Sequence, residues 1–217
     1  MTQVRLPAAE PAYLQPLLSH CHRRRYAKDS DIIRAGDPAS SLYYLVEGSV
    51  AVVFEDDEGR EIILTYLNRG SFMGEMGLFT EQARRSVMIR SRTACLVAEL
   101  QYQRLMQLFD GELKAYTKDI LFAIGSQLTQ RLLSTSRKVG HLAFLDVAGR
   151  VARTLLELCR EPDAMTHPDG MQIKVTRQEV GRIVGCSREM VGKVLKHLEE
   201  QNLIRVRGKT MVVLGVR

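Results

Sequence analysis

Glycines recur at a regular spacing through the first half of the chain and divide it into short apolar segments. They lie 11 or 12 residues apart, at Gly36, Gly48, Gly59 and Gly70. The segments 41–46, 49–55 and 61–67 are rich in β-branched and aromatic residues, and 86–92 alternates polar and apolar residues. Such runs between turn residues are typical of short strands. Residues from about 30 to 100 are therefore predicted to form a small antiparallel β-roll.

Helical periodicity replaces this pattern after about residue 101. Between Lys118 and Lys138 there is no proline and a single glycine. Apolar residues and a threonine follow a heptad, at Leu121, Leu128 and Thr135, with Ile124 and Leu132 in the adjacent turns. The pattern predicts a helix of roughly 30 Å. It fits either an amphipathic helix packed on its own domain or one helix of a parallel coiled-coil dimer.

The excess positive charge of the chain lies in its last fifth. The net charge is +6, and residues 171–217 contain 10 Lys and Arg against 4 Asp and Glu. Residues 1–170 contain 21 of each kind and are neutral. This distribution is typical of an appended nucleic-acid-binding module, although a basic tail can also be merely solvated.

The same region has the pattern of a helix-turn-helix. Thr176, with Glu179 three residues later, has capping-box spacing. Gly185 can adopt the left-handed conformation that ends the first helix, and Ser187 can cap the second. An ordinary αα-hairpin with a solvated basic face is the alternative. The agreement of caps, glycine turn and local charge favours a DNA-binding unit.

The second helix has a polar face with the side chains that read base edges. This face consists of Arg188, Glu189, Gly192, Lys193 and Lys196. Arginine can donate two hydrogen bonds to guanine, and glutamate can accept one from cytosine. Residues 203–215 resemble two strands around Gly208, with Lys209 at the tip, and predict a wing that contacts phosphates.

Turn residues place the domain boundaries. A break is expected at Gly140, Asp146 can cap a helix over 147–160, and 161–170 is predicted to be a loop. Since two-fold readers of DNA need a dimer interface, the coiled-coil interpretation of the long helix is favoured. The predicted α+β protein has a β-roll domain at 1–117, a dimerisation helix at 118–139 and a winged helix-turn-helix at 140–217.

A glycine-flanked turn in the first half could hold a nucleotide. Residues 71–79, SFMGEMGLF, lead into a short helix and are followed by ARRSV at 83–87. Backbone N–H groups at such a turn can bind an anion. Glu75 can accept from a ribose hydroxyl, and Arg85 with Ser86 can hold a phosphate. An ordinary turn with surface arginines is the alternative.

The chain resembles the cyclic AMP receptor protein (catabolite activator) family over essentially its whole length. The matching stretches are LYYLVEGSVAVV, GEMGLF followed by ARRSV, TSRKVGHLAFLDV, PDAMTHPDGMQIKVTRQEVGRIVGCSREMVGKVL and GKTMVV. The resemblance implies a homodimeric transcription regulator that responds to cyclic AMP, binds double-stranded DNA at TGTGA-like half-sites and contacts RNA polymerase.

The resemblance also assigns residues to these surfaces. Cyclic AMP would be held by Gly74, Glu75, Met76, Arg85, Ser86, Thr135 and Ser136, the last from the partner subunit. Bases would be read by Arg188, Glu189 and Lys193. Other DNA contacts would come from Ser187, Thr176, Gln178, Lys196 and Lys209. RNA polymerase would meet Thr166, His167 and Gly170 in the 162–172 loop, and a basic patch of His22, Arg24 and Arg104.

Two features depart from the best-known member of that family. Lys193 stands where that member has an arginine, and lysine cannot form the planar two-bond fork, so specificity at that base is expected to be relaxed. The segment 108–121 is about five residues longer and joins the roll to the long helix. A protein that binds DNA without ligand is therefore an alternative.

Other functions are alternatives to this one. Cyclic GMP or a cyclic dinucleotide could replace cyclic AMP, and a β-roll could instead regulate an enzyme. Beyond residue 140 the sequence contains no nucleophile–base pair, phosphate-binding loop or metal triad, which argues against an enzyme. Metal or iron–sulfur binding is not expected, because the cysteines are far apart, at Cys21, Cys95, Cys159 and Cys186. No apolar run approaches the ~20 residues of a membrane span, so a cytoplasmic protein without membrane contact is expected.

Overall fold

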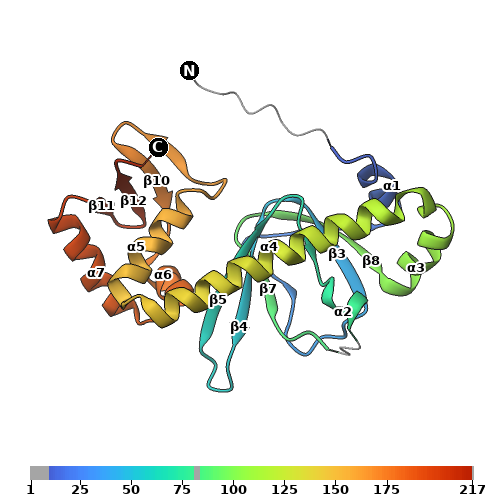
Figure 1. Ribbon diagram of the computed structural model, residues 1–217, viewed down its shortest axis with the longest axis horizontal. Helices are drawn as coiled ribbons and strands as arrows, with labels where there is room; N and C mark the ends of the chain where they lie inside the picture. The colour runs from blue at the N-terminus through green and yellow to red at the C-terminus, as the bar shows by residue number, and fades with distance from the viewer. Residues whose placement is uncertain (1–9, 81–83, 217) are drawn as a thin grey trace. The chain divides into compact units, whose positions relative to one another are not determined.

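The structure, a computed structural model, describes residues 10–80 and 84–216. Inter-residue contacts divide the chain into two compact units. The first comprises residues 1–50, 67–86 and 90–131, and the second comprises 51–66, 87–89 and 132–217. Each unit is described by itself below, with the element labels of Figure 1.

The first unit is built mainly from strands, with short helices at its start and end. Its elements are α1 (Leu14–Ser19), β1 (His22–Tyr26), β2 (Asp31–Ile33), β3 (Ser41–Glu47), β6 (Phe72–Met73), α2 (Met76–Phe79), β8 (Cys95–Gln101), α3 (Tyr102–Asp110) and a 3-10 turn at Lys114–Tyr116. Three further strands contribute residues to both units, namely β4 (Ser49–Glu55), β5 (Glu61–Asn68) and β7 (Met88–Ser91). One antiparallel sheet has the order β1-β8-β3-β6, and another sheet has the order β2-β7-β4-β5.

The predicted β-roll is confirmed, and one of its apolar clusters joins β3 and β8 to α1 and α3. Leu17, Phe72 and Leu105 are fully buried in it. The sequence missed β1, which precedes the predicted start of the roll, because HRRRY has no apolar face. A strand at the edge of a sheet can carry such a run, since its side chains remain in water.

Helix α4 (Thr117–Phe144) is longer than predicted and is drawn without interruption in Figure 1. The predicted break at Gly140 is wrong, since the helix continues for four residues beyond it. A glycine inside a helix costs roughly 1 kcal/mol relative to alanine but leaves the backbone hydrogen bonds intact. The helix ends instead before Asp146, whose carboxylate accepts from Gly149 N and caps the next helix.

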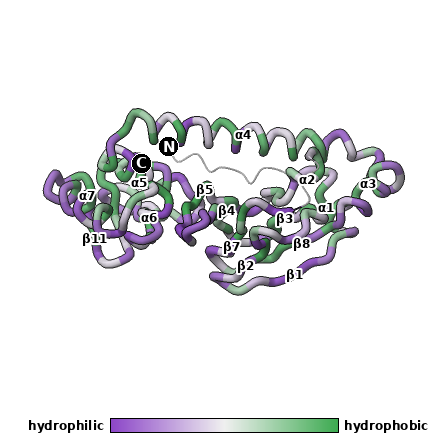
Figure 2. The backbone as a smooth tube through the Cα atoms, turned by 90° about the horizontal axis from the view of Figure 1, so that it is seen from below, coloured by the Kyte–Doolittle hydropathy of each residue, from purple (hydrophilic) through white to green (hydrophobic). Residues whose placement is uncertain are grey.

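The apolar residues of α4 divide between two faces. Ile120 and Ile124 are fully buried in the core of the first unit, so Ile124 does not belong to a separate coiled-coil seam. Leu121, Leu132 and Val139 remain exposed, and Figure 2 shows hydrophobic and hydrophilic residues alternating along the helix. Part of the helix therefore packs on its own domain, and another part leaves apolar surface uncovered.

The remaining elements of the second unit form a winged helix-turn-helix, as predicted. They are α5 (Val147–Leu158), β9 (Met165–His167), β10 (Gly170–Lys174), α6 (Arg177–Val184), α7 (Arg188–Glu200), β11 (Ile204–Arg207) and β12 (Thr210–Leu214). Their antiparallel sheet has the order β11-β12-β10-β9. Val151, Val180, Val191 and Met211 have no exposed surface and join α5, α6, α7 and the sheet in one core.

The prediction of a loop over 161–170 is wrong in its second half. Met165–His167 forms β9 and pairs with β10, which begins at Gly170. The turn signals of Pro168 and Asp169 therefore belong to a hairpin, whose three-residue first strand is too short to be recognised from periodicity. Among residues 10–80 and 84–216, no helix combines the length and hydropathy of a membrane span.

Candidate functional site

The turn after β6 brings a glycine backbone against an arginine. Gly74 has φ +77°, and a Cβ atom there would lie 2.8 Å from Arg85 Nη1 and 2.9 Å from Ser41 O. Only glycine accommodates both the left-handed backbone and this close approach. The residue predicted from the GEMG motif is thus explained by the fold.

Arg85 is fixed at this turn by three acceptors of its own unit. Its Nη1 atom donates to Gly74 O and to the Tyr102 hydroxyl, both at 3.0 Å, and Nη2 donates to Ser41 O at 2.6 Å. The guanidinium carbon lies 5.8 Å from the ring centres of both Tyr43 and Tyr102. A guanidinium has five N–H donors, so Nε and one hydrogen of Nη2 remain for an anion.

Glu75 is almost fully buried and is paired with a residue that the sequence did not reveal. Arg131 of α4 donates from Nη1 to Glu75 Oε1 at 2.5 Å and from Nη2 to Phe72 O at 2.5 Å. Gln127, one helical turn earlier, accepts from Phe72 N at 2.8 Å and donates to Gly70 O at 2.9 Å. The first half of α4 thus holds the segment that leads into the turn. A buried carboxylate demands a counter-ion, but the sequence does not say which of many arginines provides it.

The structure brings together only part of the predicted nucleotide-binding set. Gly74, Glu75 and Arg85 lie around one turn of the first unit. Met76 begins α2 with half its surface exposed, and Ser86 is exposed beside Arg85. Thr135 and Ser136 are exposed on α4 but belong to the second unit. Their part in the site stays a prediction.

The helix-turn-helix has the caps that the sequence predicted. Thr176 Oγ1 accepts from Glu179 N at 3.0 Å, and Ser187 Oγ accepts from Met190 N at 3.2 Å. Gly185 between the helices has φ +74°. A Cβ atom at Gly181 would lie 2.7 Å from Cys186 O, so a second glycine allows α6 to pack closely on the turn.

Helix α7 presents its polar residues to solvent while its apolar stripe is buried. Val191, Val194, Leu195 and Leu198 are buried. Arg188, Glu189, Lys193 and Lys196 are exposed. Within the part of the chain that the structure describes, the first three form no ion pair, and Lys196 lies 3.9 Å from Glu200. The base-reading side chains thus have donors and acceptors available.

The predicted phosphate contacts are also at the surface of the second unit. Gln178 in the first turn of α6 is exposed, and so is Lys209 at the tip of the wing, next to Gly208 with φ +64°. The Lys209 backbone oxygen accepts from Val175 N at 2.8 Å, which anchors the wing beside α6. Arg205, by contrast, is paired with Asp169 at 2.5 Å.

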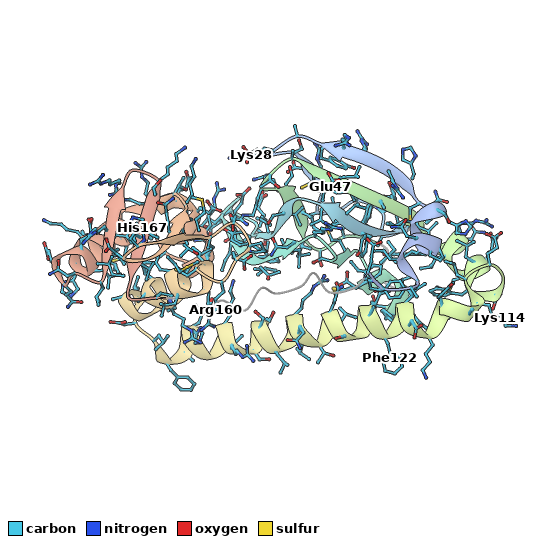
Figure 3. All side chains as sticks on the ribbon, turned by 90° about the horizontal axis from the view of Figure 1, so that it is seen from above. Lys28, Glu47, Lys114, Phe122, Arg160 and His167 are labelled. Atoms are coloured by element: carbon cyan, nitrogen blue, oxygen red, sulfur yellow. The ribbon has the colours of Figure 1, made fainter. Side chains whose placement is uncertain are left out.

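The residues predicted to contact polymerase differ in accessibility. Thr166 on β9 is exposed, and His167, labelled in Figure 3, is half-buried. Gly170 is buried, and a Cβ atom there would lie 2.0 Å from Val213 O, so sheet packing alone explains the glycine. His22 and Arg24 are exposed on β1, and Arg104 is exposed on α3 with Glu112 3.9 Å away.

Known families match both halves of the chain. Residues 23–112 match the cyclic nucleotide-binding domain family, and residues 149–216 match the Crp-like helix-turn-helix domain family. The chain is 58% identical over 208 residues to the cAMP-activated global transcriptional regulator Vfr of Pseudomonas aeruginosa, with 94% of this chain and 95% of that protein covered. It is 56% identical over 211 residues to the cAMP-activated global transcriptional regulator CRP of Salmonella typhimurium, with 97% and 98% covered.

A solved structure shares both the fold and much of the sequence. The c-di-GMP-responsive global regulator CLP of Xanthomonas campestris superposes with a TM-score of 0.89 at 52% identity. The match covers 93% of this chain and 98% of that one. In this chain the glycine turn lies within the residues that match the first family, and helices α6 and α7 lie within those that match the second.

Proposed function

Since the chain belongs to the CRP family of transcription regulators, we propose that it is a homodimeric, cyclic AMP-responsive regulator. It binds palindromic DNA with TGTGA-like half-sites, contacts RNA polymerase and works in the cytoplasm. It acts by binding and is not an enzyme. The observation that carries the proposal is the exposed, unpaired set of Arg188, Glu189 and Lys193 on the capped helix α7. The turn with Arg85 and Glu75 supplies an effector site in the same chain.

Cyclic AMP is recognised at the Gly74 turn. The phosphate accepts hydrogen bonds from Arg85 Nε and Nη2 and from the Ser86 hydroxyl, because a charged bidentate donor suits a phosphate. A ribose hydroxyl donates to the Glu75 carboxylate, which Arg131 keeps in place. Met76 flanks the sugar, and Thr135, with Ser136 of the partner subunit, contacts the adenine. Ligand contacts on both the roll and α4 allow binding to shift the protein between two arrangements.

DNA is bound with α7 in the major groove. Arg188 donates to guanine, Glu189 accepts from cytosine, and Lys193 makes a single donor contact at a third base pair. Thr176 and Ser187 use their hydroxyl oxygens as helix caps, so their hydroxyl hydrogens can donate to phosphates. The remaining phosphate contacts come from Gln178, Lys196 and Lys209.

Two copies associate through α4. The exposed apolar residues Leu121, Leu132, Val139 and Leu142 lie along the helix, and Figure 3 shows Phe122 projecting from it. Burying this surface on a second copy removes it from water, and the two α7 helices then reach two half-sites. Thr166 and His167 on β9 provide one polymerase contact, with the buried Gly170 shaping the hairpin that carries them, and the basic patch of His22, Arg24 and Arg104 provides the other.

Fluorescence anisotropy with a palindromic TGTGA-type duplex, at fixed salt, tests the proposal. Cyclic AMP should increase the affinity strongly in the wild type and not in Arg85→Ala. Arg84→Ala is the matched control, because Arg84 is exposed and its guanidinium donates to Gly36 O, away from the Gly74 turn. Tight, specific binding that is independent of any cyclic nucleotide would reject the effector role. Failure to prefer the palindrome over random DNA would reject the regulator itself.

The likeness to CLP supports cyclic di-GMP as a second candidate effector. The same titration with cyclic di-GMP separates the two. Stronger DNA binding with cyclic AMP alone favours the main proposal. A response to cyclic di-GMP alone, whether it strengthens or weakens DNA binding, favours the second.

A further inference from the structure

The two glycines of the GEMG motif make room for two different side chains. A Cβ atom at Gly74 would meet Arg85, as described above. A Cβ atom at Gly77 would lie 2.7 Å from the Tyr102 hydroxyl oxygen and 2.9 Å from Tyr102 Cε2. Gly77 sits in α2 without a left-handed backbone, so it is required for space and not for conformation. Glycine is therefore required at position 77 because the side chain of Tyr102 packs against it.

Tyr102 is held firmly at the start of α3, directly after β8. Its backbone N–H donates to Ser40 O at 2.9 Å. Its hydroxyl donates to Gly74 O and accepts from Arg85 Nη1 at 3.0 Å. Its ring lies beside the guanidinium at 5.8 Å. Both hydrogen-bonding capacities of the phenol are thus directed at the turn and at the arginine.

We propose that Tyr102 is the positioning residue for phosphate recognition, because its hydroxyl fixes Arg85 against the Gly74 turn before the nucleotide arrives. The inference rests on the proposed function, in which Arg85 holds the phosphate of a cyclic nucleotide. Tyr102 itself needs no contact with the ligand. Its hydroxyl occupies one Nη1 donor, so that Nε and the remaining hydrogen of Nη2 are available for phosphate oxygens.

Preorganisation explains why such a residue affects affinity. An arginine side chain has several rotatable bonds, and ordering it only when the ligand binds weakens binding. A hydrogen bond to a charged group is also stronger than one between neutral groups. Loss of the Tyr102 hydroxyl removes one bond of the guanidinium and one bond of Gly74 O. Affinity for the nucleotide should fall about tenfold.

The other tyrosine beside Arg85 offers a matched control. The Tyr43 ring lies at the same 5.8 Å from the guanidinium carbon, but no hydrogen bond joins the Tyr43 hydroxyl to Arg85. Glu99 is its neighbour across the β3–β8 pair. Burial and the Glu99 carboxylate raise the pKa of Tyr43 to about 12. Removing its hydroxyl leaves all three hydrogen bonds of Arg85 intact.

Calorimetric titration with cyclic AMP compares the wild type, Tyr102→Phe and Tyr43→Phe. Tyr102→Phe should bind about tenfold more weakly, and Tyr43→Phe should bind as the wild type does. Thermal unfolding without ligand checks that both variants are folded. In an Arg85→Ala background, Tyr102→Phe should cause no further loss, because the arginine it positions is absent.

The two phosphorothioate diastereomers of cyclic AMP provide a readout that a general structural defect would not change. They place sulfur on one or the other exocyclic phosphate position, so a fixed guanidinium distinguishes them. The affinity ratio of the two should move towards one in Tyr102→Phe and remain unchanged in Tyr43→Phe. A defect in packing alone would lower the affinity for both diastereomers by the same factor. An unchanged affinity ratio in Tyr102→Phe would therefore overturn the proposal.

The outcomes separate the inference from the function on which it rests. If the wild type binds cyclic AMP and Tyr102→Phe matches it in affinity and in diastereomer ratio, the role of Tyr102 is rejected and the effector site stands. If the wild type binds no cyclic nucleotide, the effector role fails and the inference fails with it.

Discussion

The Arg182 guanidinium of α6 lies 3.0 Å from the Glu61 carboxylate of β5, within the second unit. A second polar contact joins the same two elements, because the Tyr66 hydroxyl donates to Glu179 Oε1 at 2.6 Å. Ile183 of α6 packs on the apolar residues of β4 and β5. The β4–β5 hairpin therefore touches the first helix of the helix-turn-helix through an ion pair, a hydrogen bond and an apolar cluster.

Neutralising either partner of this ion pair should destabilise the second unit modestly. Glu61→Gln or Arg182→Gln is expected to lower the free energy of unfolding by about 1 kcal/mol, because Arg182 is partly exposed and screened by solvent. The double variant should lose less than the sum of the two single variants. Urea unfolding of the four proteins measures the coupling, and strict additivity would show that the pair contributes nothing.

Lys138 should make stability depend on pH in the alkaline range. Its ammonium is partly buried and donates to Ile63 O at 3.1 Å and Leu64 O at 2.6 Å. Burial lowers the pKa of Lys138 below its ordinary 10.5, whereas the pKa in the unfolded chain stays near that value. Between the two values the unfolded state binds more protons, so the contribution of Lys138 to stability rises with pH up to about 10.5.

The comparison with Lys138→Met isolates this contribution, since methionine is an unbranched side chain that lacks the terminal ammonium and cannot titrate. The unfolding free energy of the wild type minus that of the variant should rise as the pH approaches 10.5 from below. A fall in this quantity over the same range would mean that the ammonium form is favoured in the folded state. The measurement is urea unfolding at a series of pH values.

Replacing Arg131 should lower the free energy of unfolding far more than replacing an exposed arginine. Arg131→Gln leaves the carboxylate of Glu75 buried without its cation, at a cost of about 3 kcal/mol. The added substitution Glu75→Gln should restore much of the loss, because the unpaired charge is then gone. Denaturant unfolding of the single and double variants tests this, with Arg84→Ala as the exposed control. Equal stability of Arg131→Gln and wild type would contradict the pairing.

Two glycines of the second unit should respond to alanine in opposite directions. Gly185→Ala forces a side chain into a left-handed backbone and should cost about 1 kcal/mol. Gly140→Ala places a methyl group on a helical position where, among the described residues, no atom beyond the adjoining turns of the helix backbone lies within 4 Å, and should stabilise the protein by about 1 kcal/mol. Thermal unfolding of both variants checks the signs. Destabilisation by Gly140→Ala would argue that α4 breaks there after all.

DNA titrations should distinguish a residue that reads a base from a residue that binds a phosphate. Arg188→Ala should lose about 1–3 kcal/mol of discrimination at one base pair. Lys196→Ala should weaken binding to all sequences alike and reduce the salt dependence by about one phosphate contact. Anisotropy on a set of duplexes with single base changes measures both. If Arg188→Ala lowers the affinity for every duplex by the same factor, Arg188 does not read a base.

Much of the fold was predictable because its signals are local. The strands 41–47, 49–55 and 61–68 follow from apolar runs between glycines, and each signal lies within a few residues of the structure that it specifies. The caps of α6 and α7 depend on side chains that bond to a backbone three residues away. Composition along the chain placed the positive charge on the domain that carries α7.

Local sequence signals gave wrong predictions at three places, namely Gly140, Ile124 and the strand β9. The glycine at 140 predicted a break, but α4 continues because no proline interrupts its hydrogen bonds. Ile124 fits a heptad and is nevertheless buried in the roll core, because different faces of one helix can pack against different partners. The short strand β9 exists only because β10 pairs with it.

The sequence by itself determined the β-roll, the long helix, the winged helix-turn-helix and the presence of Arg85 and Glu75 beside a glycine turn. Only the tertiary structure decided that Arg131 neutralises Glu75, 56 residues away, and that Tyr102 holds Arg85, 17 residues away. The physical reason is that backbone conformation depends on neighbours along the chain, whereas the partner of a buried charge depends on which distant surfaces pack together.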